Sequence, residues 1–79
     1  MSKIPKRLPI DLLFGELYAY NYYGEQKWFG VPTEQISNGE YRFLTEDGYK
    51  MGEAKYCTRI WENSLLEKYK KLKDEARGK

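Results

Sequence analysis

Aromatic side chains are the main candidates for a functional surface in this chain, and they would act by binding rather than by catalysis. The sequence has two tryptophans, eight tyrosines and three phenylalanines, and twelve of these rings fall between Phe14 and Trp61. Tyrosine and tryptophan combine an apolar body with a polar tip, so they suit a contact surface as well as a core. In an extended segment over residues 16–23, alternation places Tyr18, Tyr20 and Tyr22 on one face.

With Tyr23 on the other face, the strand has four tyrosines in seven positions, more than one buried face requires, so we expect some of the rings to face solvent. The candidate partner-binding residues are Tyr18, Tyr20, Tyr22 and Trp28, which could anchor a protein surface. The competing interpretation is structural. A domain of 79 residues needs most of its rings to cover the apolar stripe of a C-terminal helix, with Trp61 and Leu65 packed among them.

Lysines and arginines gather at the two ends of the chain. Formal charges sum to +3 over residues 1–7, −4 over residues 8–66 and +3 over residues 67–79, which agrees with the net charge of +2. The alternative function is therefore nucleic-acid binding, with bases stacked on the rings and phosphates held by Lys3, Lys6, Arg7, Lys70, Lys73 and Arg77. A solvated helix is the competing interpretation, because acidic and basic residues mix at helical spacing in this segment.

Catalytic and metal-ligating patterns are absent from the sequence. There is no histidine, and Cys57 has no second thiol as a partner. The carboxylates have no spacing that singles out a pair, and the glycines do not form a phosphate-binding loop. We therefore predict a protein that is not an enzyme, with no catalytic residues, no metal and no cofactor, and we interpret Cys57 as an ordinary buried thiol.

Turn residues divide the aromatic region into short strands that must position these rings. Gly24-Glu25 predicts a tight reversal, Asn38-Gly39 is the strongest hairpin signal, and Glu46-Asp47-Gly48 predicts a further turn. Pro32 is expected to end the second strand or to confine it to an edge, with residues 33–36 in a loop or a helical turn.

Two periods fit the residues after Gly52. Alternation over residues 56–61 predicts a strand, whereas Cys57, Trp61, Leu65 and their successors at three- and four-residue spacing predict a long amphipathic helix from about residue 53. Both interpretations end in a helix that reaches residue 77. Ser64 and Glu67 have the spacing of a capping box, which favours a helix that begins at about residue 64.

The sequence thus predicts an α+β protein: a small antiparallel β-meander of three to five strands closed by a C-terminal α-helix, of which a partly open SH3-like barrel is one form. Residues 1–9 form a basic arm and residues 10–79 a single domain. No export signal or membrane span is evident, so we predict a cytoplasmic protein. The expected function is that of a non-catalytic accessory or inhibitory factor, such as phages and mobile elements encode, that contacts a protein partner through its strand aromatics.

Overall fold

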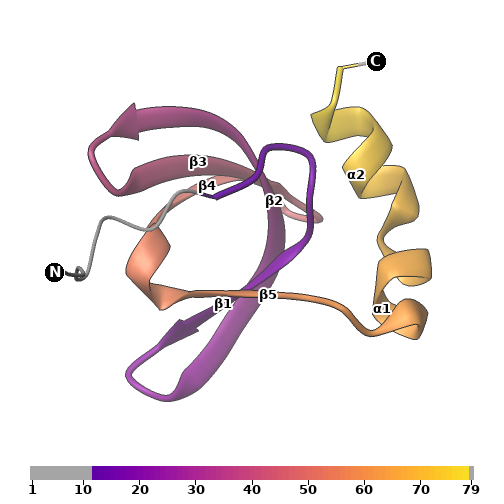
Figure 1. Ribbon diagram of the computed structural model, residues 1–79, viewed down its shortest axis with the longest axis horizontal. Coiled ribbons are helices and arrows are strands. Elements are labelled where there is room, and N and C mark those ends of the chain that lie inside the picture. Colours follow the sequence, from indigo (N-terminus) through magenta and orange to yellow (C-terminus); the bar gives the residue numbers. More distant parts are fainter. Residues whose placement is uncertain (1–11, 79) are drawn as a thin grey trace, which may run out of the picture.

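The computed structural model describes residues 12–78 as a five-stranded antiparallel sheet followed by C-terminal helices (Figure 1). The strands lie in the order β4-β3-β2-β1-β5, and each ladder joins antiparallel neighbours. The elements are β1 (Tyr18–Tyr22), β2 (Glu25–Ser37), β3 (Glu40–Thr45), β4 (Gly48–Glu53), the 3-10 helix η1 (Ala54–Tyr56), β5 (Cys57–Arg59), α1 (Asn63–Lys68) and α2 (Lys70–Ala76). The predicted α+β meander with a helical C-terminus is confirmed, and the arm predicted over residues 1–9 lies outside the described residues.

Left-handed backbone conformations at glycines form the hairpin turns. Tyr23 and Gly24 both have positive φ, 53° and 77°, which is the requirement for a two-residue turn that matches the twist of the strands. This turn lies one residue before the predicted Gly24-Glu25 reversal. Gly39, with a φ of 83°, ends the turn between β2 and β3 as predicted.

Strand β2 is central and runs through Pro32, so the prediction that Pro32 ends the strand or confines it to an edge is wrong. Residues 33–36, expected in a loop or helical turn, are also part of β2. The proline is tolerated because the register between β2 and β3 shifts between Pro32 and Glu34. Before this point β2 pairs with β1, as in Tyr18 with Gly30, and from Val31 onward it pairs with β3.

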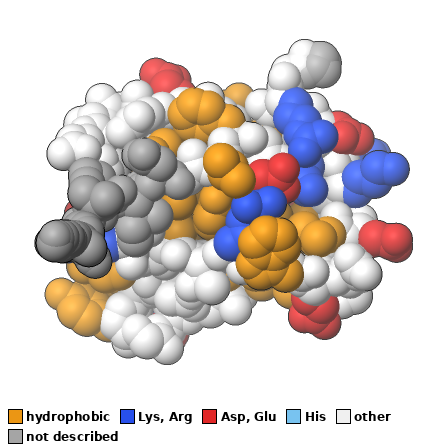
Figure 2. Space-filling view, viewed as in Figure 1, with side chains coloured by type: hydrophobic (Ala, Val, Ile, Leu, Met, Phe, Trp, Pro, Cys, Tyr) orange, Lys and Arg blue, Asp and Glu red, His pale blue; other side chains and the backbone are white. Residues whose placement is uncertain are grey.

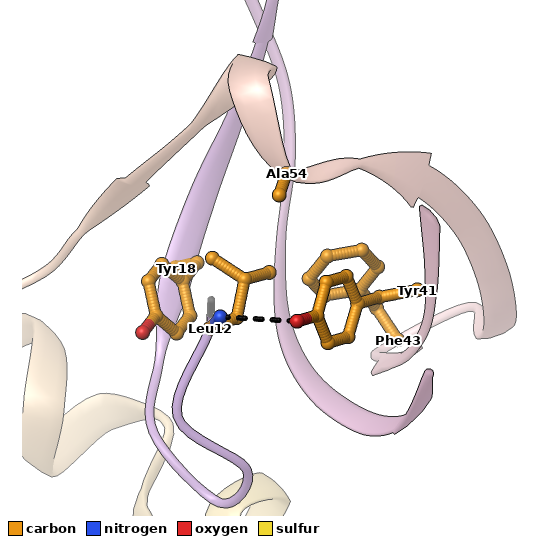
Figure 3. Close-up of a cluster of buried hydrophobic side chains, with 5 residues drawn as sticks. All are labelled: Leu12, Tyr18, Tyr41, Phe43 and Ala54. Atoms are coloured by element: carbon orange, nitrogen blue, oxygen red, sulfur yellow. Dashed lines mark hydrogen bonds between the residues drawn. The ribbon is translucent and has the colours of Figure 1, made fainter. Parts of the chain in front are cut away.

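The first of two hydrophobic clusters lies inside the curl of the sheet (Figure 3). Its buried members come from β1, β3, η1 and the segment before β1: Leu12, Tyr18, Tyr41, Phe43 and Ala54. The Tyr41 hydroxyl accepts a hydrogen bond from the Leu12 backbone N–H over 3.2 Å. This bond ties the segment before β1 to a strand 29 residues later.

The second cluster lies between the sheet and the C-terminal helices. Alternation along β2 directs Phe29 and Val31 to this side, where the Phe29 ring stacks on Tyr69 with centroids 5.2 Å apart. Aliphatic side chains supply most of the remaining contacts, among them Leu17, Leu44, Ile60, Leu65 and Leu72. The expectation that most rings cover the helix is therefore wrong, because the strand aromatics gather mainly on the opposite side of the sheet.

Residues 53–62 adopt the strand alternative rather than a long helix: η1 leads into β5, which pairs with β1. The helix begins at Asn63, and α1 and α2 are separated at Tyr69, where φ is −104° and ψ is 19°. No capping box forms, because the Ser64 hydroxyl bonds the Glu62 carboxylate and the cap residue Glu62 makes no capping hydrogen bond with its own side chain. The helix therefore starts without the cap that the sequence indicated.

Candidate aromatic contact site

Tyr20 and Trp28 form the centre of a continuous group of rings. They face each other directly across the β1–β2 ladder, and their rings stack with centroids 4.5 Å apart and planes inclined by 3°. Trp28 also meets the buried ring of Phe43 edge to face at 5.1 Å. One side of this stack is thus anchored in the first hydrophobic cluster, which fixes the positions of the two half-buried rings.

The group continues from this stack towards the β1–β2 turn. Tyr56 of η1 meets Tyr20 at 5.9 Å and Tyr22 at 5.0 Å, and Tyr22 meets Tyr23 at 4.4 Å. Exposure rises along this path, reaching 40% at Tyr22 and 82% at Tyr23. We call this set the aromatic ladder: Tyr20, Tyr22, Tyr23, Trp28 and Tyr56.

Three of the four predicted contact residues belong to the aromatic ladder, and Tyr18 does not. Only 6% of Tyr18 is exposed, and its hydroxyl accepts a hydrogen bond from the Leu13 N–H at 2.9 Å. Its inclusion in the contact set is therefore wrong, because the first β1 position on that face is covered by the core. Sequence analysis missed Tyr56, which reaches the ladder through η1, and Tyr23, which leaves the strand alternation at the turn.

Charges around the aromatic ladder are paired with one another. Lys27 contacts Glu25 at 2.9 Å, and Lys55 contacts Glu53 at 3.4 Å while its ammonium lies 5.3 Å from the centre of the Tyr56 ring. Tyr56 and then Glu53 raise the pKa of Lys55, so this lysine stays charged. These two ion pairs therefore add no net charge beside the ladder.

Burial keeps the hydroxyl of Tyr20 protonated. Burial is the main cause that raises its pKa, partly offset by the hydrogen bond that its oxygen accepts from the Glu53 N–H at 3.4 Å. The phenol is thus neutral near pH 7. It contributes a polar tip without adding charge.

A second group of functional side chains surrounds Glu16. Its carboxylate contacts Arg59 of β5 at 3.2 Å, Lys73 of α2 at 3.4 Å and Arg77 at 3.5 Å. The Arg59 guanidinium also lies 4.3 Å from the centre of the Trp61 ring. We call these five residues the Glu16 cluster, and Figure 2 shows basic, acidic and apolar side chains gathered beside the C-terminal helices.

Of the residues predicted for nucleic-acid binding, the three that the structure describes do not form one group. Lys73 and Arg77 meet in the Glu16 cluster, whereas Lys70 is exposed and makes no ion pair with Glu16. Lys3, Lys6 and Arg7 lie outside the described residues. Sequence analysis could not find Glu16 as their partner, because it precedes Arg77 by 61 residues. Trp61, expected in the core, is 71% exposed.

Cys57 and the acidic side chains are further candidates for chemistry within residues 12–78. Burial raises the pKa of the Cys57 thiol to about 12, so it is protonated and a poor nucleophile near neutral pH. Within these residues no three acidic or thiol side chains gather to hold a metal ion. An open hollow of about 220 Å³ beside α2 is lined by two lysines and two glutamates together with Tyr69 and Leu72, so its charges balance.

No protein-family model matches the chain, and comparisons with curated proteins and with solved structures found no match. Among the described residues, neither helix has the length and apolar character needed to cross a bilayer.

Proposed function

We propose that this protein is a non-catalytic accessory or inhibitory factor that binds a protein partner through the aromatic ladder. The observation that carries this proposal is that contacting rings become more exposed to solvent from the Tyr20–Trp28 stack to Tyr23. A hydrophobic core would bury these rings, and a solvated turn has no need of adjacent tyrosines.

Rigidity supports a role in binding. The half-buried rings are held by Phe43 and by each other, so little side-chain entropy is lost when a partner covers them. Tyrosine and tryptophan provide large contact areas with few rotatable bonds and are enriched among the residues that dominate interface energies. The ladder therefore has the composition of an anchor surface.

The electrostatics favour a protein over a nucleic acid at this surface. Lys55, whose ammonium lies over the Tyr56 ring, and Lys27, which is adjacent to Trp28 in β2, each contact a glutamate. Nucleic-acid binding depends on unbalanced positive charge that displaces counterions from phosphates. A surface with cancelling charges and exposed phenols suits a protein contact that combines apolar burial with hydrogen bonds.

Site-specific photo-crosslinking in the cells that naturally produce the protein tests this proposal. A photoreactive phenylalanine analogue replaces Tyr23 in one variant and Tyr49 in another. Tyr49 is the matched control, because it is 64% exposed yet belongs to β4 and lies outside the ladder. We expect position 23 to crosslink to a discrete protein and position 49 to give much less of that product.

The Tyr22→Ala substitution is then combined with the photoreactive residue at position 23, so that a second ring of the ladder is removed. It should reduce the crosslink from position 23, because it removes a neighbouring anchor, while Tyr49→Ala should leave the yield unchanged. Equal crosslinking of the same proteins from positions 23 and 49 would contradict the proposal. A product that is sensitive to nuclease would assign the ladder to nucleic acid instead.

A further inference from the structure

We propose that the Glu16 cluster is a second docking surface, which receives an acidic segment of a partner protein that also carries an apolar side chain. This surface is distinct from the aromatic ladder. It is built by the loop before β1, by β5 with the segment that follows it, and by α2, whereas the ladder is built by β1, β2 and η1. The inference therefore stands independently of the function proposed above.

Charge is the first argument. One carboxylate, that of Glu16, faces the three cations of Arg59, Lys73 and Arg77, which leaves two positive charges without a compensating acid in the cluster. Because the ion pairs are partly shielded from solvent, this excess charge is screened less than charge on an open surface. An incoming carboxylate would restore the balance.

Arg77 is the residue best placed to accept that carboxylate. It is about half exposed, and its contact with Glu16 is long, at 3.5 Å between Nη2 and Oε2. A guanidinium has five N–H donors in a planar fork that matches a carboxylate. Within residues 12–78 the side-chain hydrogen bond of Arg77 goes to Glu16 through Nη2 alone, so its other donors can engage a second acid without loss of this contact.

The loop before β1 holds the Arg77 side chain in this position. At Gly15, with a φ of +85°, a Cβ atom would lie 2.9 Å from Arg77 Nε. The absence of a side chain at Gly15 thus lets the arginine lie across the backbone of the loop. The guanidinium is oriented before a ligand arrives, which lowers the entropic cost of binding.

Trp61 supplies the apolar part of the surface. Its indole is 71% exposed, and one ring face is occupied by Arg59 at 4.3 Å. Exposed tryptophan beside arginine is the composition most enriched at the energetic centres of protein interfaces. A partner side chain such as leucine or phenylalanine could cover the indole while a neighbouring acid reaches Arg77.

The arrangement of the charges disfavours a nucleic acid. All three cations converge on the oxygens of one carboxylate, so their positive charge is concentrated at one point of the surface. Lys70, which could extend the positive charge along α2, forms no ion pair with Glu16. A phosphate backbone needs cations spread along a track, whereas a single acidic side chain needs them at one point.

NMR titration with a short peptide in which glutamates flank a Phe-Leu pair tests the proposal. The two indole N–H signals of the protein report separately on the two surfaces, Trp61 in the Glu16 cluster and Trp28 in the aromatic ladder. We expect saturable shifts of the Trp61 signal and no shift of the Trp28 signal. A shift confined to Trp28 would place the peptide on the ladder and overturn this inference without affecting the proposed function.

Charge-matched variants identify the determinant. Arg77→Gln should weaken peptide binding by about five- to tenfold, because it removes a charge-assisted contact. Lys70→Gln changes the net charge equally but lies outside the cluster, so it should change the affinity by less than about twofold. Trp61→Ala should also weaken binding, and being exposed it should leave the stability unchanged.

Four further outcomes would overturn the inference. The first is that the peptide shows no saturable binding at low salt, and the second is that a peptide with glutamine in place of glutamate binds equally well. The third is that Arg77→Gln and Lys70→Gln lose the same amount of peptide affinity. The fourth is that a single-stranded oligonucleotide shifts the same Trp61 signal and binds more tightly than the peptide. The last result would assign the cluster to nucleic acid.

Discussion

Gly52 of β4 lies directly against the ring of Tyr20. A Cβ atom at position 52 would come within 2.5 Å of Tyr20 Cε1 and 3.0 Å of its Cδ1 and Cζ atoms. The same ring stacks on Trp28. The absence of a side chain at Gly52 is therefore what allows β4 to approach β1 while the first ring of the aromatic ladder keeps its place.

We predict that Gly52→Ala displaces Tyr20 and destabilises the protein by about 1–3 kcal/mol, the usual cost of overpacking a tight site. Urea denaturation followed by tryptophan fluorescence measures both effects, because the Trp28 indole loses its stacked neighbour. In a Tyr20→Ala background the clash is absent, so Gly52→Ala should then cost much less. Equal costs in the two backgrounds would mean that the Tyr20 ring is not the obstacle.

Tyr41→Phe should release the segment before β1. The Tyr41 hydroxyl is buried and accepts the Leu12 N–H at 3.2 Å (Figure 3), so its removal leaves a buried backbone donor without an acceptor. We expect a loss of about 1–2 kcal/mol in the free energy of unfolding. Tyr49→Phe is the control, since Tyr49 is exposed. Faster hydrogen exchange at the Leu12 amide, with unchanged exchange in β3, would show that the substitution loosens the segment before β1 and not the strand that carries Tyr41.

The meander could be predicted because glycine conformations act locally. The turns at Gly39 and Gly48 need only a residue that tolerates positive φ, and the alternation of Tyr18, Tyr20 and Tyr22 follows from strand geometry alone. Pro32 misled the prediction because a register shift, which depends on the partner strand β3, accommodates the ring. A local signal thus failed where pairing between distant residues decided the outcome.

The candidate sites could be predicted only in part for the same reason. Strand alternation places Tyr18, Tyr20 and Tyr22 on one face, but it does not tell which of these rings the core covers, and Tyr18 is covered. The Glu16 cluster joins residues up to 61 positions apart. Neither spacing nor composition marks Glu16 among the other acids of the chain.

Glu16→Gln should destabilise the protein through repulsion among the three cations that converge on this side chain. We expect a loss of about 1–2 kcal/mol at low salt, more than for an exposed ion pair because the contacts are partly shielded. Unfolding measured at low and high salt should show the difference from wild type narrowing as salt screens the repulsion. Glu34→Gln, which removes only the exposed pair with Arg42, should have a smaller effect.

Leu72→Ala tests whether the C-terminal helices stabilise the sheet. Leu72 of α2 is buried in the second hydrophobic cluster together with Val31 of β2. We therefore expect its truncation to lower the free energy of unfolding by about 2–5 kcal/mol. Leu13→Ala, at an exposed leucine, is the control and should have little effect. A two-state transition that shifts as a whole would mean that helix and sheet unfold together. Loss of helical signal before the sheet unfolds would mean that they do not.

Cys57 should make the stability depend on pH in the alkaline range. Burial raises its pKa from the ordinary 9.0 to about 12, so between these values the unfolded chain has lost a proton that the folded protein keeps. The unfolded state binds fewer protons there, and the stability falls as pH rises from about 9 towards about 12. Below pH 9 both states are protonated and this contribution is fully present.

The difference between wild type and Cys57→Ala isolates this contribution, because the two proteins share every other titrating group. Chemical denaturation at several pH values should show the wild type losing stability more steeply than the variant. Parallel curves would contradict the raised pKa. Thiol alkylation at pH 8 gives an independent measure, because it should be slow in the folded protein and rapid in urea.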